Sequence, residues 1–359
     1  MKIVYVTHSL RSCWNHGNAH FLRGVLSELA AQGHEVLSIE AEANWSLQNL
    51  LLEREAPSDT AFRKSYPLLK PVTYSAEDEA LTLLDGADLV MVHEWNEPSL
   101  VAAIGRARAR GSFRLLFHDT HHRAVSDPDA IRRFDLDGYD GVLAFGATLA
   151  RVYEGWGWRG RVHVWHEAAD TRVFRPPEIE QARGGAVWIG NWGDGERSEE
   201  LESMLLAPAQ RAGLPLDIHG VRYPEHALVM LRAHGARYHG WLPNMRTPQV
   251  FARHLVTVHV PRRFYTTHLP GIPTIRVFEA LACGIPLVSA EWTDSEGLFT
   301  PGEDYLVARD GGEMLRHLRD VANDAGLRAS LVRRGLATIF ARHTCRHRAD
   351  ELLKMTATL

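Results

Sequence analysis

A carboxylate and a guanidinium stand three residues apart within a mostly apolar stretch in the second half of the chain. The stretch reads GIPTIRVFEALACGIPLVS over residues 271–289, and its charged residues are Arg276 and Glu279. Residues at this spacing are neighbours on a helix surface, so both side chains point the same way. A carboxylate so placed can accept hydrogen bonds from two adjacent ribose hydroxyls, which makes Glu279 the predicted ribose ligand. The alternative is an exposed ion pair on a surface helix.

The helix that carries this pair is expected to offer an anion site at its N-terminus. Pro273 suits its first turn and Gly284 its end. Free N–H groups and the helix dipole favour a phosphate there, and Thr274 and Arg276 can add donors. Arg262 and Arg263 lie on the loop before the helix, and two adjacent cations there are expected to stabilise a leaving diphosphate without a metal ion. Of the two, we select Arg263. A solvated charged loop is the alternative for Arg263.

A glycine-rich turn, IGNWG at 189–193, follows the first predicted strand of the second half. Glycine lets a backbone approach a phosphate or a sugar closely. We therefore add Gly190, Asn191 and the nearby Arg197 to the predicted phosphate site. An ordinary tight turn is the alternative, because short glycine motifs are common.

Histidine and aspartate gather in the first half of the chain in the segment HDTHH at 118–122, directly after a predicted buried strand. Either residue type can take a proton from a hydroxyl group near neutral pH. The candidate base is one of His118, Asp119 and His121, because sequence alone does not determine side-chain direction. Both residue types also bind metals, but this cluster lacks a spaced ligand set, so no metal site is predicted. A structural role at the strand end is the second alternative.

Two further groups of residues, 16–18 and 93–95, follow predicted strands of the first half. We assign both to the binding of a second substrate, the one whose hydroxyl group gives up the proton. Glu94 and Glu97 are reserve bases for the same proton. Gly17 allows close approach of a ligand, whereas the alternative for Asn18 is simple capping of the next helix. The predicted acceptor-binding residues are His16, Gly17, Asn18, His93, Glu94 and Trp95.

Strand and helix patterns alternate along the chain in two series, which is typical of doubly wound parallel sheets. Buried-strand patterns lie at 2–7, 34–39, 89–93, 113–118, 141–145 and 161–165, and then at 186–189, 216–219, 236–239, 256–260, 285–289 and 305–307. Two prolines and two glycines interrupt the pattern between the series. We predict an α/β protein of two Rossmann-like domains whose parallel sheets face a central cleft: an N-terminal domain at 1–170, a linker at 171–185, a C-terminal domain at 186–340 and a helix at 341–359 that could pack back on the N-terminal domain.

Composition narrows the classes of protein that fit. Of the 359 residues, 45% are hydrophobic and 23% charged, and no apolar run approaches the ~18 residues of a membrane span. The first residues, Met1–Val6, suit a strand and not a secretory signal, and the scattered Cys13, Cys283 and Cys345 suit free thiols in a reducing compartment. We therefore expect a soluble cytoplasmic protein. Its net charge of −4 gives no overall basic excess for nucleic acid or anionic lipid.

The run TIRVFEALACGIPLVS at 274–289, followed by EGLF at 296–299 and PGED at 301–304, resembles group 1 glycosyltransferases of the GT-B fold. It is most similar to the branch of CgeB-type, spore-maturation-like proteins, which tends to carry a glycine and a His/Arg pair where this chain has Gly335, His343 and His347–Arg348. The opening HGNAHFLRGVLSELAAQGHEV, at 16–36, is also similar to the first loop and helix of the fold. One position departs from the paired glutamates of many group 1 enzymes: Glu279 matches the second, and Gly271 replaces the first.

The resemblance implies a glycosyltransferase, hexosyltransferase-like within EC 2.4, that moves a sugar from a nucleoside diphosphate sugar to an acceptor hydroxyl. The C-terminal domain would hold the donor and the N-terminal domain the acceptor. The resemblance also implies a nucleobase at the strand ends that carry His219, Gly220 and Trp241, with Trp241 as a stacking ring or else a core aromatic. We expect no cofactor beyond the donor, no metal ion and no transmembrane segment, and the acidic balance argues against a nucleic-acid partner.

Three alternatives to this function stay open. A fold can host several activities, so an epimerase or phosphorylase acting on nucleotide sugars is the nearest. A glycosyltransferase acting on modified DNA bases is the second, and it predicts DNA binding that weakens steeply with salt. The third is a nucleotide-sugar-binding protein without catalysis, which the missing carboxylate at Gly271 suggests.

Overall fold

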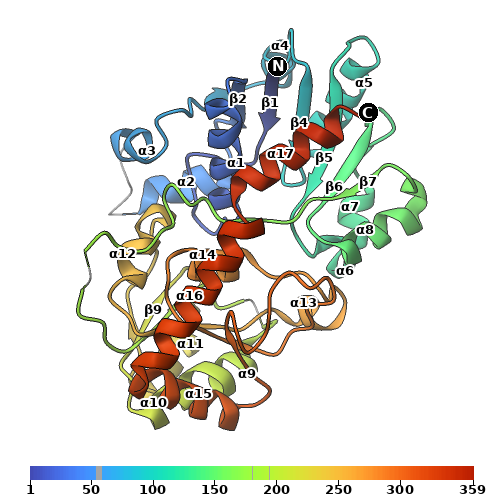
Figure 1. Cartoon of the computed structure of the whole chain (residues 1–359). Helices are drawn as coiled ribbons and strands as arrows, with labels where there is room; N and C mark the ends of the chain where they lie inside the picture. Colours follow the sequence, from blue (N-terminus) through green and yellow to red (C-terminus); the bar gives the residue numbers. More distant parts are fainter. Residues whose placement is uncertain (54–58, 180, 194) are drawn as a thin grey trace. The chain divides into compact units, whose positions relative to one another are not determined.

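The computed structural model describes residues 1–53, 59–179, 181–193 and 195–359. The chain forms two compact units, Met1–Glu167 together with Cys345–Leu359, and Ala168–Thr344 (Figure 1). The predicted linker at 171–185, of which residue 180 lies outside the described residues, groups with the second unit. Of the segment at 341–359, the part from Cys345 onward groups with the first unit. No helix in the described ranges is long and apolar enough to cross a membrane.

The first unit is built on a seven-stranded sheet in the order β3-β2-β1-β4-β5-β6-β7, and all neighbouring strands are parallel. Its strands read as continuous apolar runs because helices cover both faces of such a sheet. The strands are β1 (Lys2–Val6), β2 (Glu35–Ala41), β3 (Val72–Tyr74), β4 (Leu89–His93), β5 (Arg114–Asp119), β6 (Gly141–Ala144) and β7 (Val162–Val164). Of these, β3 was not predicted from the sequence.

The helices of the first unit mostly connect successive strands. They are α1 (Ala19–Ala31), α2 (Trp45–Leu52), α3 (Asp59–Ser65), α4 (Glu77–Thr82), α5 (Pro98–Arg108), α6 (Arg123–Ser126), α7 (Pro128–Arg132), α8 (Ala147–Tyr153), the π-helical turn η1 (Glu154–Trp158) and the C-terminal α17 (Cys345–Thr356). Helix α17 packs against α1. Trp165 Nε1 donates to the carbonyl of Arg348 at 2.9 Å, and Arg348 Nε donates to the carbonyl of His166 at 3.0 Å, so α17 is also bonded to the chain after β7.

The second unit repeats this plan with a six-stranded parallel sheet in the order β10-β9-β8-β11-β12-β13. Its strands are β8 (Ala186–Ile189), β9 (Leu216–His219), β10 (Arg237–Tyr238), β11 (Val256–His259), β12 (Leu287–Ala290) and β13 (Leu306–Ala308). Its helices are α9 (Ser198–Leu201), the π-helical turn η2 (Glu202–Leu206), α10 (Ala207–Ala212), α11 (Glu225–Ala233), the 3₁₀ turn η3 (Asn244–Arg246), α12 (Thr247–Phe251), α13 (Arg263–Thr267), α14 (Ile275–Ala282), α15 (Gly311–Asn323) and α16 (Ala325–Arg342).

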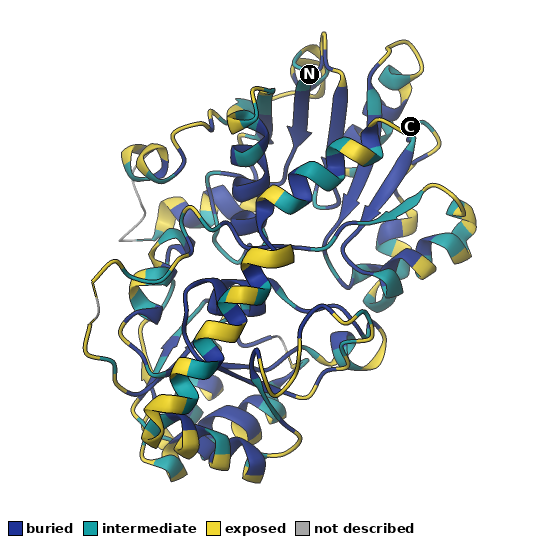
Figure 2. Ribbon diagram, in the orientation of Figure 1, coloured by how far each residue is buried: buried dark blue, intermediate teal, exposed yellow. Residues whose placement is uncertain are grey.

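The core of each unit lies between its sheet and the helices that cover it. The central strands are buried along their length, whereas helices such as α15 and α16 bury one face and expose the other (Figure 2). In the second unit Met314, Leu318 and Val321 of α15 pack with Val258 and Val288 of the sheet. Because all strands of a sheet run in one direction, their carboxyl ends meet at one edge, and this edge carries the polar residues described next.

Candidate functional site

The start of α14 is tied to the carboxyl ends of β11 and β12 through His259. Ser289 donates its hydroxyl proton to the Ala290 carbonyl at 2.7 Å and so accepts from His259 Nδ1 at 2.9 Å. His259 Nε2 is then an acceptor, and it takes the hydroxyl proton of Thr274 at 3.0 Å. Burial, and then the charges of two arginines, lower the pKa of His259 to about 3, which keeps this imidazole neutral. Thr274, predicted to donate to a phosphate, therefore donates to a histidine that the sequence analysis did not select.

Glu279 projects from α14 into the interior and is held by two partners. Asn244 Nδ2, from η3, donates to Glu279 Oε1 at 2.7 Å, and Arg276 pairs with Glu279 Oε2. The Glu279 side chain is 0% exposed and that of Arg276 is 16% exposed. This is not the exposed ion pair of the alternative prediction, because a buried carboxylate needs such partners to offset its lost hydration. Asn244, 35 residues away in sequence, thus orients the predicted ribose ligand.

Two guanidinium groups converge on one asparagine at the carboxyl end of β8. Arg197 donates to the carbonyl and to Oδ1 of Asn191, both at 2.9 Å, and Arg262 donates to the same Oδ1 at 3.1 Å. Burial, and then the positive charge of Arg262, lower the pKa of Arg197 to about 10, so Arg197 stays charged at neutral pH. We call Asn191, Arg197 and Arg262 the arginine cluster. Arg262 also pairs with Glu196 at 2.8 Å. Arg197 donates to neutral oxygen atoms, so of the two cations Arg197 gains more from an arriving anion.

Arg263, the cation chosen from the sequence, lies apart from this cluster. It pairs with Glu200 at 2.6 Å, and its side chain is largely exposed on α13. Its neighbour Arg262 points the other way, toward Asn191 and Glu196. The sequence predicted this loop as part of the site but could not show which way each of its two adjacent arginines points.

The glycines at the ends of β8 and β9 lie against each other. A Cβ on Gly220 would stand 1.9 Å from the carbonyl oxygen of Gly190, and one on Gly190 would stand 2.9 Å from Trp188. Gly190 N donates to the His219 carbonyl at 2.9 Å, so the two turns are joined directly. His219 itself stacks on His239 with ring centroids 4.8 Å apart. These contacts bring Gly190, Asn191, Arg197, His219 and Gly220 together at one sheet edge.

Trp241 follows β10 and is partly buried. Its indole Nε1 has no hydrogen-bond partner among the described residues. Buried indole N–H groups usually find an acceptor. The indole N–H of Trp241 could therefore donate to an acceptor on a ligand, and the predicted contact to a base stays a prediction.

The candidate bases His118 and Asp119 end β5 in the interior of the first unit. The Tyr5 hydroxyl bonds His118 Nδ1 at 2.8 Å, and burial lowers the pKa of His118 to about 3. Asp119 accepts from the Tyr153 hydroxyl at 2.7 Å and from the backbone N–H of His121 at 3.0 Å. Both side chains are fully buried, whereas His121 is partly exposed. A direct contact with substrate therefore fits His121 better than the other two.

Glu94, a reserve base in the sequence analysis, has a pKa raised into the range of a group that exchanges protons near neutral pH. Burial, and then the charge of Asp119, raise its pKa to about 8, although Arg123 acts in the opposite direction. Arg123 pairs with Glu94 Oε2, and the Thr120 hydroxyl donates to Oε1 at 3.4 Å. A carboxylate with a pKa near neutrality can both accept and return a proton. Neither Thr120 nor Arg123 was assigned a role from the sequence.

Thr120 joins the loops after β1, β4 and β5. The Asn18 side-chain amide donates to its carbonyl at 3.2 Å and to its hydroxyl, and His93 Nε2 lies 3.0 Å from the same hydroxyl. Asn18 precedes α1 but makes no side-chain capping bond, so the capping alternative does not hold. Asn18, His93 and Glu94 thus meet at Thr120, although Asn18 is more than 70 residues from the other two in sequence.

His16 belongs to a row of buried imidazoles, with His8, His93 and His118. Successive ring centroids from His8 to His118 are 5.7, 5.8 and 5.8 Å apart. Desolvation lowers the pKa of every member, so all are neutral near pH 7. The described residues contain no group of three or more His, Cys, Asp or Glu side chains arranged to hold a metal ion.

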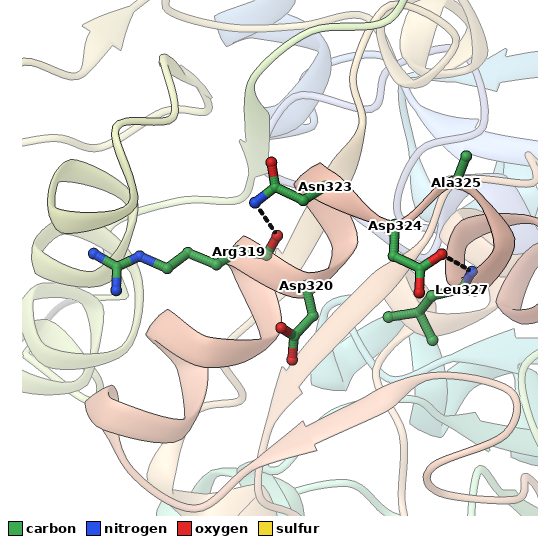
Figure 3. Close-up of a pocket in the computed structure, with 6 residues that line it drawn as sticks. All are labelled: Arg319, Asp320, Asn323, Asp324, Ala325 and Leu327. Carbon is green, nitrogen blue, oxygen red and sulfur yellow. Dashed lines mark hydrogen bonds between the residues drawn. The ribbon is translucent and has the colours of Figure 1, made fainter.

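A separate surface hollow lies where α15 meets α16 in the second unit. Its polar side chains complete helix ends: Asn323 Nδ2 donates to the Arg319 carbonyl at 2.9 Å, and Asp324 Oδ1 accepts from Leu327 N at 2.9 Å. Their side chains spread apart instead of converging (Figure 3). We assign no chemistry to this hollow.

Comparisons with known proteins place these features in a family context. Residues 197–354, less than half of the chain, match the family model described as glycosyl transferase-like. No curated protein matches the sequence. Solved structures similar to the whole chain include HepE from Anabaena in complex with UDP and glucose, with 14% identity, all of both chains covered and a TM-score of 0.68. They also include the α-glucosyltransferase AGT in complex with UDP, with 12% identity, 99% of this chain and 98% of that chain covered and a TM-score of 0.67.

A third similar structure is the lipopolysaccharide outer core galactosyltransferase WaaB in its apo form, with 13% identity, all of both chains covered and a TM-score of 0.58. At these identities the likeness establishes the architecture and nothing finer. The chain therefore has the two-domain, Rossmann-like GT-B fold, and its residues 197–354 match the glycosyl transferase-like family.

Proposed function

We propose that this protein is a glycosyltransferase that moves a sugar from a nucleoside diphosphate sugar to an acceptor hydroxyl. The observation that carries the proposal lies at the carboxyl ends of the second sheet's strands. There Arg276 pairs with the buried Glu279 carboxylate. Burial, and then the charges of Arg197 and Arg276, lower the pKa of His259, which bonds Thr274 at the start of α14. A carboxylate suits ribose hydroxyls, and paired cations beside a helix N-terminus suit a diphosphate. The UDP named in the HepE and AGT complexes supports a nucleotide ligand of this kind.

The arginine cluster would stabilise the charge that develops on the departing nucleoside diphosphate. Arg197 and Arg262 are already positioned by Asn191, so they need little reorganisation during the reaction. Fixed cations of this kind can supply what a metal ion supplies elsewhere, and we propose a metal-independent reaction without a cofactor. Turnover and UDP affinity should then be unchanged by EDTA, and restoration by Mg²⁺ or Mn²⁺ after chelation would contradict this.

Residues 1–170 would bind the acceptor, and residues 186–340 the donor. Glu94 is fully buried, as His118 and Asp119 are, so exposure does not separate these three candidates. We favour Glu94 as the base because its raised pKa suits a group that takes the hydroxyl proton, while Asn18, His93 and Thr120 fix the surrounding loops. The partly exposed His121 and Trp95 would contact the acceptor. We propose a cytoplasmic location and retain the CgeB-type branch as the closest family assignment.

The first test is a thermal-shift screen with uridine, guanosine, thymidine, adenosine and cytidine diphosphates and their sugars. Ligand binding to the native state raises Tm, so at least one diphosphate should give a clear shift. Glu279→Gln should abolish that shift, whereas the matched control Glu303→Gln, an exposed partner of Arg334, should not change it. An equal shift in Glu279→Gln would remove our assignment of the ribose ligand.

Product analysis then separates the proposed reaction from its alternatives. A glycosyltransferase releases the nucleoside diphosphate faster when an acceptor is added. An isomerised sugar ring would indicate an epimerase, and donor binding with no turnover against any acceptor would indicate a binding protein. The AGT structure with DNA containing an HMU base makes a DNA acceptor worth including in this screen.

A further inference from the structure

Three tryptophans of the first unit gather around His8, beyond the carboxyl ends of β1 and β4. The Trp45 and Trp95 rings lie 4.9 and 6.4 Å from His8, and Trp14 meets Trp45 edge to face at 5.9 Å. We call Trp14, Trp45 and Trp95 the tryptophan cluster. Trp45 is 39% exposed, and the other two are partly exposed. Large apolar side chains that lie together at a surface are typical of a ligand-binding or partner-binding site.

The rings of this cluster are held in place before any ligand arrives. Trp14 Nε1 donates to Glu53 Oε1 at 2.7 Å, and the Arg123 guanidinium lies 3.9 Å from the centroid of the Trp95 ring. The partly exposed His121 meets Trp95 edge to face at 5.3 Å. Rigid rings lose little conformational entropy when they bind, so such a surface favours affinity.

His8 places an unsatisfied polar atom beneath this apolar surface. It is 5% exposed, and its Nε2 has no hydrogen-bond partner in the described part of the chain. Burial, followed by the charge of Arg123, lowers its pKa to about 4, so the imidazole is neutral and can either donate or accept. A buried polar atom without a partner is unfavourable, and a ligand hydroxyl would relieve it.

The charges near the cluster indicate which ligand it suits. Arg11 pairs with Glu40, and Arg123 pairs with Glu94, so each of these cations already binds a carboxylate. A polyanion such as DNA binds mainly through cations that contact its phosphates. The surroundings therefore favour an uncharged ring with an apolar face and polar edges.

We propose that the tryptophan cluster binds the sugar ring of a carbohydrate acceptor, with Trp45 as the stacking face and His8 Nε2 bonded to a ring hydroxyl. The C–H face of a pyranose packs on an indole, while its hydroxyl groups lie at the ring edge. This inference rests on the proposed function, since it names the acceptor class of that reaction. Glu94, bonded to the Arg123 that covers Trp95, would lie on the same side as the bound sugar.

The test uses Trp45→Ala, with Trp158→Ala as the matched control. Trp158 is another partly exposed tryptophan of the first unit, 4.3 Å from Arg161. Binding of methyl α-glucoside, methyl β-galactoside and maltose is measured by saturation-transfer NMR with saturating UDP present. We expect Trp45→Ala to weaken the best of these at least about tenfold, about 1.4 kcal/mol, Trp45→Phe to retain part of the affinity, and Trp158→Ala to change it less than about twofold. His8→Phe, which keeps a ring and removes Nε2, should also weaken it.

The outcomes separate this inference from the function on which it rests. If UDP and the other diphosphates give no thermal shift in the wild type, the proposed function fails. If a diphosphate binds but sugar affinity is the same in Trp45→Ala, or no sugar binds, the inference alone is overturned. Preferential binding of a short oligonucleotide over all three sugars, lost in Trp45→Ala, would also overturn it and would indicate a nucleic-acid acceptor.

Discussion

Replacing Asn244 by alanine tests whether the Glu279 carboxylate must be oriented to bind a nucleotide. Asn244 Nδ2 donates to Glu279 Oε1 at 2.7 Å inside the protein, where both side chains are buried. A hydrogen bond to a charged group contributes about 1.5–3 kcal/mol. Without it the carboxylate keeps Arg276 as its partner but can rotate away from the ribose. If the ribose contact depends on this orientation, UDP affinity should fall about 10- to 100-fold.

The assay is isothermal titration of UDP into the wild type, Asn244→Ala and a control, Asn323→Ala. Asn323 also donates through its side-chain amide, to the Arg319 carbonyl at 2.9 Å, but lies at the end of α15 (Figure 3). We expect the control to bind UDP as the wild type does. For turnover, Asn244→Ala should raise the donor KM more than it lowers kcat. If Asn244→Ala lowers Tm but leaves UDP affinity within about twofold of the wild type, Asn244 is only structural and the orientation argument is refuted.

Three further predictions concern other parts of the two units. Arg262→Met should weaken UDP binding more than about tenfold, whereas Arg263→Met should have little effect, because Arg262 donates to Asn191 and Arg263 pairs with Glu200. Equal effects in titrations would contradict the arginine cluster. The pH profile of kcat/KM should rise with pH and level above about 8, because Glu94 is a base only when ionised and its pKa is raised to about 8. Glu94→Gln should remove the rising part of this profile. A rise that persists in the variant would exclude Glu94. Gly220→Ala should lower the free energy of unfolding by more than about 3 kcal/mol, since its Cβ would stand 1.9 Å from the Gly190 oxygen. Gly155→Ala, whose Cβ would have no atom within 4 Å, should change that free energy little. Urea denaturation measures both.

The sheets were largely predictable because their strands are buried on both faces. Continuous apolar runs predicted β4, β5 and β11 closely, and helical spacing predicted α14 with its charged pair. The outer strand on one side of the first sheet, β3, was not predicted. It has three residues, Val72–Tyr74, only one of them buried, so it lacks the hydrophobic signal that identifies a strand.

The sequence predicted which strand ends and helices carry the candidate site residues, but not which side chains contact one another. Strand ends predicted Glu94 and Asn191, since parallel strands bring their carboxyl ends together, and helical spacing predicted Glu279 beside Arg276. Periodicity carries no signal for partners such as Asn244, which lies in a short 3₁₀ turn 35 residues from Glu279. Sequence also gives no side-chain direction in a loop, so Arg263 was selected from the two loop arginines, whereas Arg262 is the one that donates to Asn191.

Arg276 links the two halves of the proposed donor site. In the structure it neutralises the buried Glu279 carboxylate, and its charge also acts on Arg197 and His259. A diphosphate at the start of α14 would give Arg276 a second anionic partner and draw it away from Glu279 Oε2. Glu279 Oε2 would then lose the Arg276 cation, and ribose hydroxyl groups are donors that can replace it. A nucleoside diphosphate satisfies both requirements at once, whereas inorganic phosphate would move Arg276 and leave a buried carboxylate poorly paired. The pairing of Arg276 with Glu279 therefore favours a complete nucleotide over its isolated phosphates.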